Sequence, residues 1–464
     1  METKQRNRVL GVLFVGVLMG ALDIAIVGPA LPAIQAEFGL DSRGASWIFS
    51  AYVLANLVGT PLMAKLSDHY GRRAIYVLDV GLFALGSLVV ASSHVTGGFA
   101  LLLLGRLIQG FGAGGIFPVA SAVIGDTFPP EKRGGALGMI GAVFGLAFII
   151  GPIVGGLLLG FGWQWLFLIN LPIAAVVIAL AWRVLPHVRV GGAGGFDWRG
   201  MLALTFALSS LAYGLVSIEP AQFWTSLARP AVWGWLVASA IAWIVLVRIE
   251  ARAENPVFPT QLFRRRQLTV GYTLTAGAGL GEASLVFMPS LAVASLGVAA
   301  ATASYLLMPV VFAMAIGSPL AGRLLDRFGS RTVIVAGVAT MTVGMFALSL
   351  TSTSLAGYIV SGLLIGLGLS ALLGAPVRYV TLNETTADER SAAQGLVNTF
   401  TSIGQLLGSA VVGAVATSAV GAAGYNAAFG LIGWLGVGLL AVALLLKPKA
   451  AEAMPAAAQE SRHA

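Results

Sequence analysis

The sequence predicts an all-α integral membrane protein with two similar six-helix halves and two further helices between them. Of its 464 residues, 58% are hydrophobic and only 10% are charged, whereas soluble domains carry about 25% charged residues. A run of about 20 apolar residues crosses a hydrocarbon core of ~30 Å. Fourteen such runs are present, over residues 9–31, 45–64, 74–93, 98–122, 135–159, 164–185, 200–217, 231–249, 268–294, 302–321, 332–350, 356–380, 393–419 and 424–446. The first continues past Pro29 without a small-residue cleavage site, so we expect no cleaved signal peptide.

The distribution of positive charge predicts that both termini are cytoplasmic. The net charge is +8, from 27 Lys and Arg against 19 Asp and Glu. With fourteen spans and a cytoplasmic N-terminus, every Lys and Arg falls on the cytoplasmic side except Arg43, Arg229 and, within a span, Arg106. Such asymmetry fixes orientation. The charges are dispersed over short loops, which argues against a nucleic-acid partner, and the lack of cysteine excludes disulfides and thiolate metal sites.

A charged hinge that occurs twice indicates an internal duplication. The segment Gly59–Arg73, GTPLMAKLSDHYGRR, returns 258 residues later as Gly317–Arg331, GSPLAGRLLDRFGSR, without a gap. Each copy joins the end of one apolar run to the start of the next. The segments that follow Pro118 and Pro376 keep nearly the same offset, so spans one to six correspond to spans nine to fourteen. Duplicated halves are typical of carriers in which one bundle rocks against the other.

The duplication also predicts the domain boundaries. We expect an N-terminal six-helix bundle, a linker with an inserted pair of helices, a C-terminal six-helix bundle and a disordered cytoplasmic tail. These parts cover residues 1–186, 187–266, 267–447 and 448–464.

Several motifs resemble those of the major facilitator superfamily, specifically of its fourteen-span drug:proton antiporter branch. The first hinge resembles the family's loop signature with Ala64 in place of a glycine, and the second copy keeps that glycine as Gly322. The fifth span resembles the branch's antiporter motif, with Ala147 where a glycine is expected. The segments that resemble motifs of the branch are residues 22–32, 106–112, 138–156, 163–172 and 196–198. The resemblance covers residues 9–446.

The resemblance implies a secondary active transporter, of major-facilitator fold, that exports lipophilic, cationic drugs or toxic compounds by alternating access. Inward proton flow would drive it, so the proton is the coupling ion and no other cofactor or metal is expected. The resemblance also implies a monomeric, multi-pass protein in the lipid bilayer of a bacterial cell (plasma or inner) membrane. A lipid or endogenous metabolite as cargo, or a non-transporting receptor or assembly protein, are the alternatives. The chain has no P-loop pattern, and its four histidines fall in predicted loops or the tail, which argues against an enzyme.

Carboxylates within the predicted spans are the candidate site for proton coupling and substrate. Asp23 and Glu282 each lie about fourteen residues into the first span of a half, and the repeat maps Asp23 onto Gly281, next to Glu282. A carboxyl group removed from water can hold a proton, and a cationic substrate would compete for the same carboxylate. Asp23 could instead cap a turn before Pro29 or pair with a neighbour.

Arg106 is a third charge within a span. An unpaired guanidinium there would be costly, so we expect it to meet a carboxylate, backbone carbonyls or water, and Asp23 is the candidate carboxylate. Forming and breaking this pair would gate proton release, and a static bond between helices is the alternative. Gln109, in the same motif, is a secondary candidate. Asp79 lies near the cytoplasmic end of the third span and is expected to join the arginines of the hinge rather than the transport site.

The hinges and the fifth span are expected to move. A glycine permits the tight turn between helices, and an acidic residue accepts bonds from a helix N-terminus or an arginine, which would form a cytoplasmic latch. The latch residues are Asp68, Gly71, Arg72, Arg73, Asp326, Gly329 and Arg331. A purely topogenic role for the arginines is the alternative. Small residues and a proline in the fifth span favour close packing with a bend, at a moving seam or a static contact. These residues are Gly151, Pro152, Gly155 and Gly156.

Overall fold

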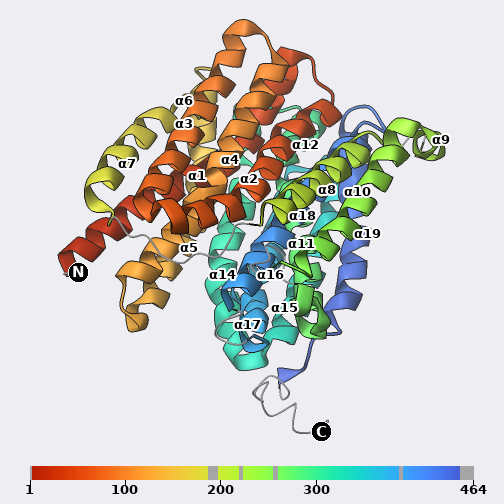
Figure 1. Ribbon diagram of the computed structural model, residues 1–464. Helices are drawn as coiled ribbons and strands as arrows, with labels where there is room; N and C mark the ends of the chain where they lie inside the picture. Colours follow the sequence, from red (N-terminus) through yellow and green to blue (C-terminus); the bar gives the residue numbers. More distant parts are fainter. Residues whose placement is uncertain (1–2, 187–196, 219–222, 254–259, 386–389, 450–464) are drawn as a thin grey trace. The chain divides into compact units, whose positions relative to one another are not determined.

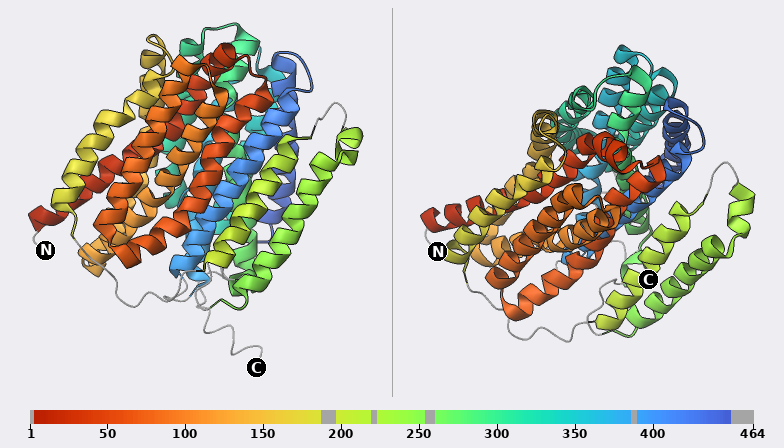
Figure 2. Two further views of the ribbon diagram at one scale, coloured as in Figure 1. Left: turned by 45° about the horizontal axis from the view of Figure 1, so that its top comes forward. Right: turned by 90° about the horizontal axis from the view of Figure 1, so that it is seen from above.

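The computed structural model describes residues 3–186, 197–218, 223–253, 260–385 and 390–449. Within these ranges, the side chains of some helical residues, Asp68 and Asp326 among them, lie outside the description, as do the predicted linker residues 187–196 and the predicted tail from residue 450 onward. The described part is built of α-helices (Figures 1 and 2). Each predicted apolar run coincides with one helix or two consecutive helices.

Contacts divide the chain into two compact units. The first contains residues 1–209 with 253–257 and 299–305, and the second contains the remainder. The helices of the first half are α1 (Thr3–Phe38), α2 (Ser42–Tyr70), α3 (Arg72–Thr96), α4 (Phe99–Thr127), α5 (Pro130–Leu159), α6 (Trp165–Leu168) and α7 (Asn170–Val184). The inserted region follows as α8 (Trp198–Val216), α9 (Phe223–Ala228) and α10 (Pro230–Glu250).

The second half begins with the 3-10 helix η2 and continues through nine α-helices. They are η2 (Thr260–Arg264), α11 (Arg266–Leu285), α12 (Met288–Leu296), α13 (Ala300–Tyr305), α14 (Met308–Phe328), α15 (Ser330–Thr351), α16 (Leu355–Leu373), α17 (Ala375–Asn383), α18 (Arg390–Ala416) and α19 (Ala422–Ala443). Predicted runs six, nine, ten and twelve are each split. The helices that continue the last three, α12, α14 and α17, all have a proline in their first turn. Proline has no backbone N–H. Residues in the first turn of a helix do not use theirs within the helix, so proline is favoured there and disfavoured further along.

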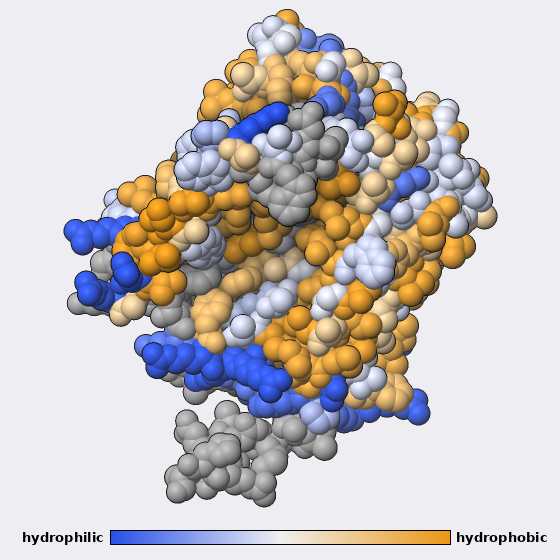
Figure 3. All heavy atoms as spheres, turned by 90° about the vertical axis from the view of Figure 1, so that its right-hand side faces the viewer, coloured by the Kyte–Doolittle hydropathy of each residue, from blue (hydrophilic) through white to orange (hydrophobic). Residues whose placement is uncertain are grey.

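Many described helices are long and apolar enough to cross a membrane. Eleven helical segments meet this condition, and α11 with α12, bent by 43° at their break, would make a twelfth. The 30-residue α5 and the 19-residue α8 occupy the two other predicted runs. Hydrophobic side chains predominate on the face in Figure 3, with hydrophilic ones along its lower edge. Exposed Trp233, Ile241 and Ile244 on α10 contribute to the apolar surface, which suits lipid and not water.

The tight turns predicted at the two hinges are confirmed. Gly71 is the only residue between α2 and α3, and Gly329 the only one between α14 and α15. Their φ angles are 102° and 82°, in a region that side chains with a Cβ avoid. The repeated motif therefore folds into the same backbone turn in both halves.

Both halves also pair their first and fifth helices through glycine. A Cβ on Gly151 or Gly155 of α5 would collide with Ala25 or Pro29 of α1. A Cβ on Gly408 of α18 would likewise collide with α11. Pro29 lies inside α1, which is continuous from Thr3 to Phe38, so there is no turn for Asp23 to cap.

Candidate functional site

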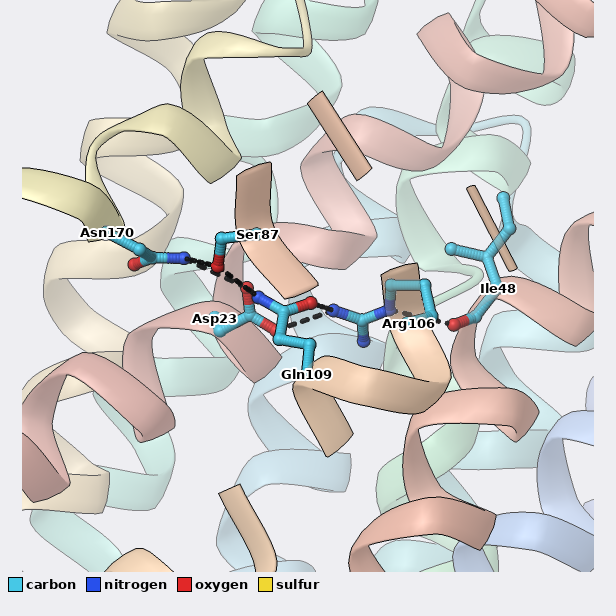
Figure 4. A network of polar contacts seen from close by, with 6 residues as sticks. All are labelled: Asp23, Ile48, Ser87, Arg106, Gln109 and Asn170. Atoms are coloured by element: carbon cyan, nitrogen blue, oxygen red, sulfur yellow. Dashed lines mark hydrogen bonds and ion pairs between the residues drawn. The ribbon is translucent and has the colours of Figure 1, made fainter. Parts of the chain in front are cut away.

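Asp23 lies at the centre of a buried polar network in the first unit (Figure 4). Its side chain has no solvent exposure. Asp23 Oδ2 accepts from Arg106 Nη1 at 2.6 Å, and Oδ1 accepts from Gln109 Nε2 at 2.6 Å and Asn170 Nδ2 at 3.3 Å. The structure thus brings together the Asp23 and Arg106 that the sequence suggested as partners. All three of these bonds are donated to Asp23, as suits an ionised carboxylate, which only accepts.

Arg106 spans the gap between α1 and α2. Besides Asp23, its Nη1 donates to Gln109 Oε1 at 2.6 Å, and its Nε donates to the Ile48 carbonyl of α2 at 3.0 Å. Its guanidinium lies 4.2 Å from the ring centroid of Tyr52. Arg106 is fully buried and its Nη2 has no hydrogen-bond partner among the described residues. The bond to Asp23 is therefore the charge compensation for a cation with no access to water.

Gln109, Asn170 and Ser87 complete the network. Gln109 Nε2 and Asn170 Nδ2 both donate to Ser87 Oγ, at 2.8 and 3.2 Å. The orientation of the Gln109 amide is fixed, because turning it over would face its NH₂ toward the Arg106 guanidinium and its oxygen toward the Asp23 carboxylate. Sequence reasoning missed Ser87 and Asn170, since a polar uncharged residue in an apolar run carries little signal of its own.

Close packing of α3 on α4 places these side chains (Figure 2). A Cβ on Gly86 of α3 would overlap the Gln109 backbone, and a Cβ on Gly105 of α4 would overlap the backbone of Val90. The two glycines let the helix backbones approach, as small residues do between membrane helices. The short amides then reach Asp23 directly, without a water.

The network has no equivalent in the second half. The repeat offset maps Asp23 onto Gly281, Ser87 onto Met345 and Arg106 onto Leu364, while Gln109 corresponds to Leu367. The structure places Gly281 beside Met341, Leu369 and Met345, in apolar surroundings. The duplicated scaffold therefore folds without the charges, and the charges of the first half are an addition to it.

Glu282 lies on α11 in the second unit. Its Oε2 accepts from Gln405 Nε2 of α18 at 3.0 Å. The side chain is half-buried, in contrast to that of Asp23. The partner of Glu282 is thus a neutral amide, whereas that of Asp23 is a guanidinium.

The first hinge is held by an ion pair that the sequence did not predict. Arg72 Nε lies 3.0 Å from Asp126 Oδ2 on α4, and Arg72 Nη1 donates to Ser67 Oγ on α2 at 2.7 Å. Arg73 donates to the Trp182 carbonyl at 3.2 Å and lies over the ring of the same residue. Arg72 thus ties α2, α3 and α4 together, while Arg73 ties α3 to α7.

The second hinge uses other partners. Position 330 is a serine where the first half has Arg72, and Glu384 stands at the repeat position of Asp126. Glu384 Oε1 pairs instead with Lys447 Nζ at 2.6 Å. Lys449 Nζ donates to the Arg327 carbonyl at 2.9 Å. The chain segment after α19 therefore supplies cations that bond to residues near the second hinge.

The prediction that Asp79 joins the hinge arginines is wrong. Arg72 and Arg73 have the partners given above, and neither oxygen of Asp79 has a hydrogen-bond partner among the described residues. Asp79 is fully buried. It lies seven residues beyond Arg72 on α3, so about 10 Å along the axis, which is too far for contact with the hinge.

The whole chain matches a known family. The model of the Major Facilitator Superfamily matches residues 13–289 and, in a second match, residues 271–463. The chain belongs to this superfamily. With its many apolar helices it is a multi-pass membrane protein and a transporter, and not an enzyme.

Curated relatives match most of the chain. An uncharacterized MFS-type transporter, YfiU, of Bacillus subtilis (strain 168) is 34% identical over 88% of this chain and 79% of its own length. "Multidrug resistance protein 3" of the same organism is 30% identical over 88% of this chain and 79% of its own length. The "Tetracenomycin C resistance and export protein" of Streptomyces glaucescens is 30% identical, over 88% and 75% respectively.

Solved structures share the fold at low identity. A D-xylose-proton symporter has a TM-score of 0.69 at 16% identity and covers 96% of this chain and 98% of its own. A bacterial homologue of the human lysosomal transporter Spinster, inward-facing and unoccupied, has a TM-score of 0.68 at 17% identity, with 96% and 97% covered. These likenesses show the all-helical superfamily fold.

Proposed function

We propose that this protein exports lipophilic, cationic compounds, including drugs, in exchange for protons. Two relatives at 30% identity are named for multidrug resistance and for tetracenomycin C resistance and export, and these names support the choice of cargo and direction. The observation that carries proton coupling is the buried Asp23–Arg106 pair, an ion pair in a site with no solvent exposure.

The geometry suggests how one carboxylate could exchange a proton for a cation. Protonation would turn one carboxyl oxygen of Asp23 into an O–H donor. That donor would face Arg106 Nη1 or Gln109 Nε2, which are donors themselves. Protonation therefore requires Arg106 to move away from Asp23. A cationic group that approached Asp23 would displace Arg106 in the same way. Proton and substrate would compete for one carboxylate, which couples their fluxes without covalent chemistry.

Glu282 is proposed as a second coupling or substrate residue, in the second half. Its half-buried carboxylate is held by one neutral amide, so a cationic substrate could reach it without first displacing an arginine. Gln109, which bonds both members of the Asp23–Arg106 pair, is proposed to transmit the displacement of Arg106 to Ser87 on α3.

The hinge and the fifth helix are proposed to gate the change of access. The latch residues Asp68, Gly71, Arg72 and Arg73, with Asp326, Gly329 and Arg331 in the second half, would close the cytoplasmic side. Because the Arg72–Asp126 pair joins α3 to the end of α4, it would break when that side opens. The contact of Gly151 and Gly155 with α1, beside Pro152 inside α5, would be the seam that moves against Asp23.

We further propose the topology and setting that the sequence predicted. The chain would cross the membrane fourteen times with cytoplasmic termini, as two six-helix bundles (residues 1–186 and 267–447) with residues 187–266 as linker and inserted helices. It would act as a monomer in the plasma or inner membrane of a bacterium. The proton would be its only coupling ion.

Exchange in proteoliposomes tests the proposal. With an imposed pH gradient, the protein should accumulate a cationic lipophile, should be slower with a neutral analogue, and should lose pH-driven transport on Asp23→Asn. Asp41→Asn is the matched control, because Asp41 caps α2 by accepting from the Gly44 N–H and asparagine caps equally well. Full pH-driven transport by Asp23→Asn would remove Asp23 from the mechanism. Movement of phospholipid in place of the cations would make the protein a lipid carrier.

A further inference from the structure

Asp79 is a buried acid that the proposed mechanism does not use. It lies on α3 with no solvent exposure, and neither carboxyl oxygen has a hydrogen-bond partner among the described residues. Asp23, by comparison, accepts three hydrogen bonds in an equally buried site. Two acids on neighbouring helices are thus equally removed from water, and only one of them is compensated.

The carboxyl group of Asp79 is held against the backbone of α4. A Cβ on Gly115 would collide with Cγ and both carboxyl oxygens of Asp79. A Cβ on Gly112, one turn earlier, would collide with the Asp79 carbonyl and with Phe83. The acid therefore fills the space that two glycines of α4 leave open. Any residue larger than glycine at position 115 would have to displace it.

No charged side chain that the structure describes forms a hydrogen bond or an ion pair with Asp79. The helices packed against α3 include α2, α4, α6 and α7, and α1 touches it where a Cβ on Gly16 would collide with Tyr76. The ionisable residues of α1 are Lys4, Arg6, Arg8, Asp23 and Glu37, and none of them bonds to Asp79. Arg106 and Asp126 of α4 are engaged with Asp23 and Arg72, and no hydrogen bond or ion pair links Asp79 to any side chain that the structure describes. The other ionisable residues of these helices are Arg43, Lys65, Asp68, His69 and Tyr70 on α2, Tyr52 beside Arg106, and Arg183 on α7, and the side chains of Lys65, Asp68 and His69 lie outside the description. On α3 itself, the Tyr76 hydroxyl donates to the Leu13 carbonyl at 3.5 Å.

An ionised carboxylate in such surroundings would be costly. Burial of a charge without a partner costs several kcal/mol or more, which the group avoids by binding a proton. The fold does not need the acid either. The repeat maps Asp79 onto Gly337 of α15, where a Cβ would meet Ala371 and Gly368 of α16, so the second half makes the same close helix contact with a glycine.

We propose that Asp79 is a second proton-binding site of the first half, which holds a proton in this conformation and releases it when α3 and α4 separate. Asp79 lies eight residues from Ser87 and seven from Arg72, so about 12 Å and 10 Å along α3. It therefore stands between the Asp23 network and the latch, where a proton that leaves Asp23 toward the cytoplasm would pass. This inference rests on the proposed proton coupling.

Infrared difference spectroscopy of the purified full-length protein, recorded as a function of pH, tests the site without any transport. The carbonyl stretch of a protonated carboxyl group should be lost in Asp79→Asn and should remain in Asp23→Asn. Gly115→Ala should shift that band, because its Cβ meets the carboxyl group, whereas Gly125→Ala should not, because its Cβ points into open space. Spectra of Asp79→Asn identical to those of the unaltered protein would overturn the proposal.

Flux measurements give a second, independent readout. Asp79→Asn, and Asp79→Gly if the asparagine variant does not fold, should lower the number of protons moved per substrate while substrate exchange continues. An unchanged ratio in both variants would overturn the role of Asp79 in proton transfer. Failure of the unaltered protein to couple protons to any substrate would instead refute the proposed exporter, and the infrared band would still decide whether Asp79 holds a proton.

Discussion

Removal of the Asp23 charge should destabilise the protein and also stop proton-driven transport. Asp23 and Arg106 are both fully buried, and their closest atoms lie 2.6 Å apart. Asp23→Asn leaves the guanidinium as an uncompensated buried charge that still donates to the Ile48 carbonyl and the Gln109 amide oxygen. Breaking a buried pair from one side costs about 3–5 kcal/mol, so we expect a loss of stability of that size.

The second half of the chain supplies the matched variant. In the second half, Leu364 occupies the position equivalent to Arg106. Breaking a buried ion pair from one side is costly because it leaves an uncompensated charge, and removing both charges leaves none. Asp23→Asn combined with Arg106→Leu should therefore regain most of the stability that Asp23→Asn loses, while transport stays absent.

A double-mutant cycle of thermal unfolding in detergent, with proteoliposome flux measured on the same four proteins, checks both expectations. The coupling between the two positions should exceed about 1 kcal/mol, since contacting residues in one network couple by about 0.5–3 kcal/mol. Additive effects on unfolding would refute the charge pairing. Transport by the double variant at the native rate would refute the claim that the pair is the proton switch.

Four further outcomes are expected. Gly71→Ala should cost about 1–3 kcal/mol of unfolding free energy, because its φ of 102° strains any residue with a Cβ, and thermal unfolding would show it. Gly155→Ala should slow exchange in proteoliposomes, since its Cβ meets a proline of α1, while Gly160→Ala, whose Cβ is clear of such contacts, should not. Arg72→Gln should raise the population with an open cytoplasmic side by up to about fivefold, because the partly exposed Arg72–Asp126 pair contributes at most ~1 kcal/mol. Labelling of single cysteines, introduced into this cysteine-free chain, would measure that population. Glu282→Gln should reduce uptake of cationic substrates with little loss of stability in thermal unfolding, because no buried cation is left unpaired.

Much of the fold could be predicted from the sequence because the lipid environment constrains it strongly. A chain that crosses hydrocarbon must satisfy its backbone with helices, so apolar runs and helices coincide. Duplication then made the hinges visible, and the positive φ of Gly71 and Gly329 follows from the glycine in each copy. The breaks within α11–α12 and α16–α17 were not predicted, although Pro289 and Pro376 mark the places where the helix starts again.

The candidate site was predictable only where a residue violates the composition of its surroundings. Asp23 and Arg106 stand out because charges are rare in apolar runs, and the need for compensation pairs them. Ser87 and Asn170 do not stand out, because a serine or an asparagine is tolerated in many membrane helices. For Asp79, nearness in sequence to the hinge arginines suggested a contact. Its actual surroundings are set by the register of α3 against α4, which a single sequence does not give.

The unequal halves bear on how this carrier would work. A duplicated scaffold could place the same chemistry in both halves, yet four polar residues meet around Asp23 while Gly281, in the equivalent place, has apolar neighbours. Glycine pairs α11 with α18 as it pairs α1 with α5, so helix packing does not require the charges. An ion pair that is costly to bury and unnecessary for the fold is best explained by a conformation in which it is broken. Proton binding to Asp23 is the event that we propose breaks it.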